Sequence, residues 1–487
     1  ETDGTITVGK YAFAGCEKLK TIQHSKRITT ANEGAFYLCA ALEEIDITGL
    51  RIVGNSVFEE CTSLARVQTS PDTYIGNYMF AGCTSLQSFA FKSRRLSDYA
   101  FYNCANLNSI TFENDLYYFG AGAFGGDRSQ AYGDRRNNKL TSITLPNGTY
   151  KIGAQAFLNC IALEKVVLSA NTVIDLGSED VFRNCTAFTA FDAATSGNAH
   201  YSSNDGVLYS ADGTTVIAVP VAKTGVTLLS SATKIGAGAF AGNRDAAFTI
   251  PAIVTEIGAY AFAGSSIKNV NLSGLNSVPE GAFSGCSLDS VTGWSGIQKI
   301  GAYAFCNALD RRAQTLDLSA ATEIGDYAFA GCTFVQNAVN AANVTKIGAH
   351  AFDGADLRGE VDFSGVTELG DYAFAQNLNM KKITLGGVTK MGVGVFSVTS
   401  KNVNLMKPSL QEVIFGEGTT EIGDNAFEFI YVSSSISADY EEYETREYSD
   451  RTSLTKVVIP ASVTKIGEYA FVLCSSLKSD DMDLVNV

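Results

Sequence analysis

Residues 454–474 read LTKVVIPASVTKIGEYAFVLC, and degenerate copies of this phrase recur along most of the chain. The end of the phrase is its most regular part, as in IGAQAFLNC at 152–160 and IGDYAFAGC at 324–332. One phrase that returns at a fixed short period indicates a repeat protein.

The phenylalanine of the phrase sets that register. It occurs eighteen times, mostly at spacings of 21 to 25 residues, and the four longer gaps indicate insertions or a degenerate repeat. Four residues before it, fourteen of the eighteen units carry Gly, which indicates a tight bend or a close backbone approach. The anchor residues are Phe13, Phe36, Phe58, Phe80, Phe101, Phe124, Phe157, Phe182, Phe240, Phe262, Phe283, Phe305, Phe329, Phe352, Phe374, Phe396, Phe427 and Phe471.

Each unit also contains an alternating apolar and polar stretch, such as Leu163, Val166 and Leu168, which predicts a β-strand. A unit of about 22 residues cannot bury its own apolar face, so neighbouring units must stack and share one core. The phenylalanine column is expected to fill that core.

The full pattern, LxxIxLPxxVxxIGxxAFxxCxxL, resembles the BspA-like leucine-rich repeat family of bacterial surface proteins. Together with the period, the resemblance predicts an α/β leucine-rich-repeat solenoid. We expect a right-handed superhelix of about 19–20 repeats of 21–25 residues, with a long parallel β-sheet on one face. Residues 1–487 are expected to form this single solenoid, with insertions at 125–138, 195–225, 397–408 and 430–452. Within the second of these, Tyr201–Pro220 resembles a hairpin-like repeat variant of that family, with turns at Asp205-Gly206 and Asp212-Gly213.

Length and composition agree with a repeat array. A chain of 487 residues exceeds the roughly 250–300 residues at which a single core stops growing. The 46 Gly residues exceed an average share, the 7 Pro residues fall below one, and collagen and disorder are excluded. The net charge of -15 disfavours binding to nucleic acids and to anionic lipid. No stretch approaches the ~18 apolar residues of a membrane helix, and neither a signal peptide nor a lipid anchor can be read from the chain.

Catalytic and metal-binding motifs are not found in the sequence. Ten of the eleven cysteines lie three residues after an anchor phenylalanine, without CxxC or histidine spacing, so we interpret them as buried free thiols rather than disulfides or metal ligands. His24, His200 and His350 are far apart in the repeat order. The tyrosines two residues before the anchor could form an aromatic platform, but a packing ladder is the favoured interpretation. We therefore expect no enzyme activity, no cofactor and no metal.

Two kinds of surface are candidates for contact with a partner. The first is the exposed face of the predicted sheet, which is polar, without aromatic residues, and lacks an apolar anchor. The second is the insertion at 430–452, rich in tyrosine and charge, because insertions in rigid scaffolds often carry contacts. A solvated loop without function is the alternative for this insertion. The candidate residues are Glu44, Asp46, Arg66, Lys165, Asp317, Glu360, Asp362 and Lys382 on the sheet, and Tyr431, Tyr440, Tyr443, Arg446 and Tyr448 in the insertion.

The resemblance implies an exported protein of the bacterial cell surface or exterior, with a lipoprotein as one candidate form, and relatives are associated with adhesion to host matrix proteins and to other cells. We therefore expect a non-enzymatic adhesin, a monomer that binds a host extracellular protein or another cell-surface protein. Surface glycan or polysaccharide binding and a structural envelope role are the alternatives. The polar sheet face lacks the aromatic rings that a dedicated sugar site uses, which favours a protein partner.

Overall fold

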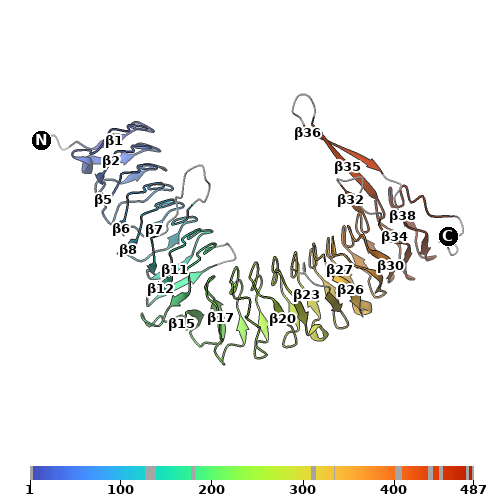
Figure 1. Cartoon of the computed structure of the whole chain (residues 1–487). Coiled ribbons are helices and arrows are strands. Elements are labelled where there is room, and N and C mark those ends of the chain that lie inside the picture. Colours follow the sequence, from blue (N-terminus) through green and yellow to red (C-terminus); the bar gives the residue numbers. More distant parts are fainter. Residues whose placement is uncertain are drawn as a thin grey trace. The chain divides into compact units, whose positions relative to one another are not determined.

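Each repeat forms one coil of a β-solenoid, in which short strands are joined by tight turns (Figure 1). The computed structural model describes residues 4–126, 139–176, 181–308, 314–333, 335–339, 341–400, 408–436, 442–448, 453–478 and 482–484. Its contacts divide the chain into two compact units. Unit 1 comprises residues 1–232 and 236–245, and unit 2 comprises residues 233–235 and 246–487.

The first face of the solenoid is the predicted parallel sheet. Its strands alternate exposed and buried residues, because the period of a strand is two, as in Ser88, Phe89, Ala90 and Phe91. In unit 1 the strands are β3 (Glu44–Asp46), β5 (Arg66–Gln68), β6 (Ser88–Phe91), β8 (Ser109–Phe112), β10 (Ser142–Leu145), β12 (Lys165–Leu168) and β14 (Ala190–Asp192). In unit 2 they are β20 (Asn269–Asn271), β22 (Ser290–Thr292), β24 (Gln314–Asp317), β26 (Val335–Val339), β28 (Gly359–Phe363), β30 (Met380–Leu385), β33 (Glu412–Ile414), β37 (Lys456–Ile459) and β39 (Met482–Leu484).

The second face is a parallel ribbon of short strands. Each strand lies just before the glycine column, the position four residues before each anchor phenylalanine. In unit 1 it contains β1 (Ile6–Val8), β2 (Ile28–Ala31), β4 (Ile52–Val53), β7 (Arg95–Leu96), β9 (Tyr118–Phe119), β11 (Gly148–Lys151) and β13 (Thr172–Asp175). In unit 2 it contains β18 (Lys234–Ile235), β19 (Glu256–Ile257), β21 (Ser277–Val278), β23 (Lys299–Ile300), β25 (Glu323–Ile324), β27 (Lys346–Ile347), β29 (Glu368–Leu369), β31 (Lys390–Met391), β34 (Glu421–Ile422) and β38 (Lys465–Ile466).

The solenoid is confirmed, but its described residues are almost free of helix. They contain three 3-10 helices, η1 (Ser25–Arg27), η3 (Trp294–Gly296) and η4 (Ala341–Asn343), and no α-helix. The α/β description is therefore not supported. The turn around most anchor phenylalanines cannot continue as an α-helix, because the residues two before and two after the anchor are left-handed, as at Tyr99 (φ 56) and Asn103 (φ 60).

The number of coils is also lower than predicted. The described residues carry seven first-face strands in unit 1 and nine in unit 2, which gives 7 + 9 = 16 turns of this kind, against the 19–20 repeats expected. The difference arises partly at residues 195–225. There β15 (Tyr201–Asn204), β16 (Val207–Ser210) and β17 (Thr215–Ala218) pair antiparallel, so this segment is a meander and not a further coil. Asp205 and Gly206 both have positive φ, as the predicted turn requires.

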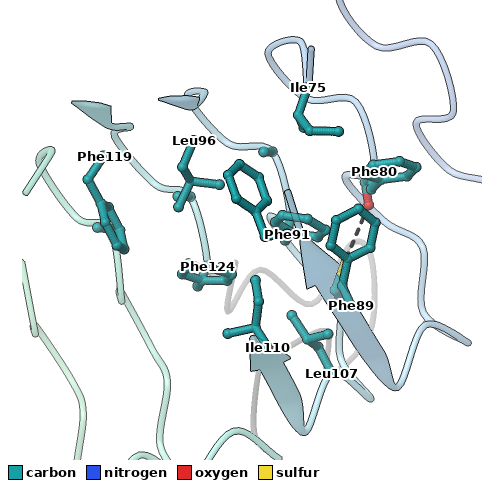
Figure 2. Close-up of a cluster of buried hydrophobic side chains, with 14 of the residues drawn as sticks. Ile75, Phe80, Phe89, Phe91, Leu96, Leu107, Ile110, Phe119 and Phe124 are labelled. Atoms are coloured by element: carbon teal, nitrogen blue, oxygen red, sulfur yellow. Dashed lines mark hydrogen bonds between the residues drawn. The ribbon is translucent and has the colours of Figure 1, made fainter. Parts of the chain in front are cut away.

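The core is built on a phenylalanine ladder. Within unit 1 the rings of Phe36, Phe58, Phe80 and Phe101 stack at centroid distances of 5.4 to 5.8 Å. The ladder stays continuous where the sequence carries insertions, since Phe427 stacks on Phe471 at 5.0 Å although 44 residues separate them. The insertions therefore leave the coil without disturbing its core. Figure 2 shows how Phe89, Phe91, Leu107 and Ile110 pack against this ladder in unit 1.

The cysteine column supplies hydrogen-bond donors to the core as well as volume. All eleven cysteines are free thiols, and nine of the ten column members are buried. Buried thiols donate to the carbonyl oxygen of the anchor phenylalanine in the preceding coil, as Cys83 does to Phe58 and Cys104 to Phe80, the bond drawn in Figure 2. Asn377, in the same column, donates from Nδ2 to the Phe352 carbonyl. The sequence analysis predicted buried free thiols at this column but did not predict that they donate hydrogen bonds to the neighbouring coil.

The glycine column allows a test of coil spacing. A Cβ on Gly153 would lie 2.3 Å from the backbone nitrogen of Ala121, whereas Gly9, at the same repeat position, has nothing within 4 Å. We predict that Gly153→Ala destabilises the protein by about 2 kcal/mol, as expected for overpacking, while Gly9→Ala has little effect. Denaturant unfolding of both variants measures this difference. Equal midpoints would contradict the close approach of coils at this column.

The thiol column allows a second test. Burial raises the pKa of Cys83, Cys104 and Cys160, and also that of the half-buried Cys306, whereas Cys16 is exposed. Because the thiolate is the reactive form, we predict that a thiol reagent modifies Cys16 rapidly in the native protein, Cys306 more slowly, and the buried members of the column only on unfolding. Mass spectrometry of labelled peptides identifies the modified residues, and Cys16→Ser serves as a control. Rapid native-state labelling of Cys83 would show the interpretation to be wrong.

Candidate functional site

The predicted contact residues of the first face fall into separate groups. Glu44, Asp46 and Arg66 come together at β3 and β5, where they line an open hollow of about 390 Å³ that His24 also lines. Arg66 donates from Nη2 to Glu44 Oε2 at 2.9 Å, and this pair is largely exposed. A surface ion pair of this kind contributes little to stability. The hollow is therefore polar, and two of the charged side chains that line it are already paired with each other.

Three predicted acidic residues have a structural role in the turns that follow their strands. The Oδ1 atoms of Asp46, Asp317 and Asp362 each accept a hydrogen bond from the backbone nitrogen two residues on, at 2.9 to 3.1 Å. This is the Asx turn, in which a short carboxylate substitutes for a backbone carbonyl. Their position at the strand end is therefore explained without a partner.

The remaining predicted charges of this face form alternating ladders across neighbouring strands. In unit 2, Glu360 is in register with Lys382, Lys382 with Glu412, and Glu412 with Lys456. Lys456 lies 2.8 Å and Lys382 3.3 Å from Glu412, and hydrogen bonds from Lys456 and Lys382 lower the pKa of that carboxyl. Opposite charges on adjacent strands stabilise the sheet, which is the simplest account of these residues.

Lys165 has the best-defined partner. Its Nζ lies 2.5 Å from Oδ2 of Asp192, a side chain only 13% exposed, which also accepts hydrogen bonds from Thr195. Burial acts to raise the pKa of Asp192, but the hydrogen bonds from Lys165 and Thr195 outweigh it and lower the pKa to about 2. The pair joins β12 to β14, which are neighbouring parallel strands.

This pair gives a pH-dependent prediction. Since the folded pKa of Asp192 is depressed from 3.8 to about 2, its contribution to stability is complete above about pH 4 and is lost as the pH falls toward 2. We predict that Lys165→Met lowers the free energy of unfolding at pH 7, and that the difference from wild type shrinks as the pH approaches 2. Denaturant unfolding at several pH values measures it, with Lys165→Arg as the conservative control. A difference that does not change with pH would exclude this ion pair as its cause.

The tyrosine column is a packing ladder. Tyr303, Tyr327, His350 and Tyr372 stack in succession at centroid distances of 4.6 to 5.0 Å. Where the next coil has Gly at this position, the ring covers it, and a Cβ on Gly34 would lie 2.1 Å from the Tyr11 ring. The ring faces therefore stack on one another within the protein, as the packing-ladder interpretation expects.

The histidines and metal-ligand types do not assemble into a site. His350 is a member of the tyrosine ladder, and its Nδ1 lies 2.8 Å from Asp353. No group of three or more His, Cys, Asp or Glu that could hold a metal occurs among the residues that the structure describes. The same part of the chain has no helix long and apolar enough to cross a bilayer.

The insertion at 430–452 contains strands, which the sequence analysis did not predict. β35 (Phe429–Ile436) pairs antiparallel with β36 (Glu442–Tyr448), and β35 also pairs parallel with β32 (Val398–Ser400). Insertions 397–408 and 430–452, which come from neighbouring repeats, thus join in one three-stranded sheet. The hairpin extends from the coils of unit 2 in Figure 1.

The predicted contact residues of this insertion occupy defined register positions. Tyr431 is paired with Glu447, Arg446 with Val432, Tyr443 with Ser435 and Tyr448 with Ile430. Tyr440 and the segment 127–138 of another predicted insertion lie outside the described residues. The signal that could have revealed the hairpin is the run FIYVSSSI at 429–436, rich in β-branched and aromatic residues.

The stacked coils, the phenylalanine ladder and the parallel sheet define a leucine-rich-repeat β-solenoid. The chain belongs to the BspA-type leucine-rich repeat family. The family model described as "BspA type Leucine rich repeat region" matches residues 2–95, 131–204, 223–310, 322–407 and 404–483. This confirms the family resemblance found in the sequence.

Solved structures of bacterial leucine-rich repeat proteins are similar to this chain. One from Bacteroides ovatus has 16% identity and a TM-score of 0.31, with 82% of this chain and 83% of that chain covered. A leucine rich cell surface protein from Faecalibacterium prausnitzii has 19% identity and a TM-score of 0.34, with 76% and 79% covered. The pneumococcal vaccine antigen PcpA has 16% identity and a TM-score of 0.26, with 91% and 78% covered. No curated protein matches the chain.

Proposed function

We propose that the chain is a non-enzymatic adhesin, exported to the bacterial surface or exterior, that binds a protein of the host or of another cell. The observation that carries the proposal is the three-stranded sheet β32-β35-β36, which extends from a rigid stack of coils. Scaffolds of this kind place variable insertions beside a constant core, and insertions are common contact sites. A structural coil needs no such extension, since the phenylalanine ladder is continuous beneath it.

Further support comes from the names and properties of similar proteins. The family model describes a repeat region and not a catalytic domain, and the similar structures include one described as a cell surface protein and one as a vaccine antigen. Binding of surface glycans, the other class considered, is less favoured because the stacked tyrosine rings are covered by one another. The adhesin proposal requires neither a cofactor nor a metal.

The proposal predicts that removing the hairpin abolishes binding. Deleting residues 432–446 and joining the directly paired Tyr431 and Glu447 through an Asn-Gly turn retains a closed chain. We expect wild-type protein to bind members of an array of matrix, plasma and cell-surface proteins, and the variant to lose those signals.

A second variant, in which residues 127–138 are replaced by a short Gly-Ser linker, serves as the control for loop removal. The array also carries polysaccharides, and thermal unfolding confirms that both variants fold. Protein signals that persist in the hairpin variant would remove the hairpin from the contact surface. Signals confined to polysaccharides would replace the proposed function by glycan capture.

A further inference from the structure

The two units differ at one repeat position of the second face, two residues before the glycine column. In unit 2 this position alternates between Lys and Glu in all coils but one, and adjacent strands pair, as Lys299 does with Glu323 at 3.1 Å. The row therefore neutralises itself along the stack. Its members are Lys234, Glu256, Ser277, Lys299, Glu323, Lys346, Glu368, Lys390, Glu421 and Lys465.

In unit 1 the same row has a different composition. It reads Ile52, Tyr74, Arg95 and Tyr118 in four successive coils. Ile52 is 62% exposed and Tyr74 is 37% exposed, and Tyr117 beside Tyr118 is 62% exposed. The members of the row face outward, since the strand period is two and the residue after each of Tyr74, Arg95 and Tyr118 is buried; Figure 2 shows this inner row as Ile75, Leu96 and Phe119.

Arg95 is held in place but is not neutralised. Its guanidinium carbon lies 3.9 Å from the centroid of the Tyr118 ring, a cation–π contact that fixes the plane of the group. Its Nε is buried and has no hydrogen-bond partner, and no carboxylate of the described residues lies within 4.0 Å of the guanidinium. Asp98, which is close by, is already occupied, since its Oδ1 accepts from Tyr118 Oη at 2.7 Å and from Ala121 N at 3.0 Å.

A partly buried cation without a carboxylate partner is costly, and such groups require an explanation in a native structure. Structural packing would be better served by the Lys and Glu alternation that unit 2 uses at this position. Arg and Tyr with an exposed aliphatic neighbour are instead the composition of interface hot spots. The feature is thus that of a contact surface.

We propose that Ile52, Tyr74, Arg95, Tyr117 and Tyr118, here named the Arg95 surface, dock an acidic segment of a protein partner. A carboxylate of the partner accepts hydrogen bonds from the Arg95 guanidinium, and apolar side chains beside it pack on Ile52 and Tyr117. The inference rests on the proposed protein-binding function and names a second surface for it.

The charge of the surroundings supports an acidic partner. Although the whole chain carries a net charge of -15, the row and the positions just before it in these coils hold Arg51, Arg94 and Arg95 and no acidic residue. Arg51 is committed to the backbone, since its Nη1 donates to the carbonyl oxygens of Thr48 and Leu50. A sulfated glycan would share the anionic chemistry, but it offers nothing to the exposed Ile52, so a protein segment fits better.

The test uses the full chain and two fluorescent peptides, one that alternates glutamate with valine and one that alternates glutamine with valine. We expect the glutamate peptide to bind, the glutamine peptide not to bind, and Arg95→Gln to weaken binding about tenfold or more, as loss of a charged hydrogen-bond donor requires. Tyr117→Ser, at an exposed position without a role in the core, is expected to weaken binding as well. Lys299→Gln, at the same repeat position in unit 2, is the matched control and is expected to have no effect.

Each other outcome overturns the inference. Equal binding of the two peptides, or an unchanged affinity in both Arg95→Gln and Tyr117→Ser, would remove the Arg95 surface. Binding of a sulfated polysaccharide that Arg95→Gln abolishes, without binding of the glutamate peptide, would assign the surface to a glycan. Failure here is distinguishable from failure of the proposed function, because protein signals on the array that survive in Arg95→Gln leave the adhesin proposal in place.

Discussion

The close approach of successive coils at the glycine column is the constraint on which the structure depends. A Cβ on Gly54 would lie 2.2 Å from the backbone nitrogen of Glu33, and one on Gly370 would lie 2.3 Å from that of Ala349, so the constraint acts in both units. At the same place the coils are joined by backbone hydrogen bonds, as from Gly325 N to Ile300 O at 2.8 Å. The distance between successive coils is thus set by direct contacts and hydrogen bonds between their backbones. The stacking of the phenylalanine rings and the pairing of the charge ladders follow from that spacing.

The sequence predicts a structural feature well where one physical requirement selects one residue type at a fixed repeat position. The glycine column, the phenylalanine column and the alternation in strands such as Ser88–Phe91 are all visible in one repeat and recur in the others. The family follows from the same residues. The α/β description was wrong because the turn at the anchor contains left-handed residues such as Tyr99. Tyrosine rarely adopts this conformation, so the residue type gives no sign of it in the sequence.

The candidate sites could be predicted only in part, because they depend on contacts outside one repeat. The outward position of Asp46 and Asp362 was predictable from the strand pattern, but their hydrogen bonds to the following turn were not. The hairpin depends on pairing between β32 and β35, which lie in different repeats. Arg95 was not among the predicted contact residues, because the residues before the glycine column were interpreted as a connection and not as a surface. The alternation of Lys and Glu at this position in unit 2 is nevertheless visible in the sequence.

The stacked arrangement also determines how each unit responds to mechanical load. In the described part of the chain, the paired strands and stacked rings join neighbouring coils, as those of the Phe427 and Phe471 coils do. In such a quasi-one-dimensional array, tension applied to an end coil is resisted by one interface at a time. Coils would therefore peel off singly, each at a similar force, and a unit would lengthen in steps of about one repeat instead of failing all at once.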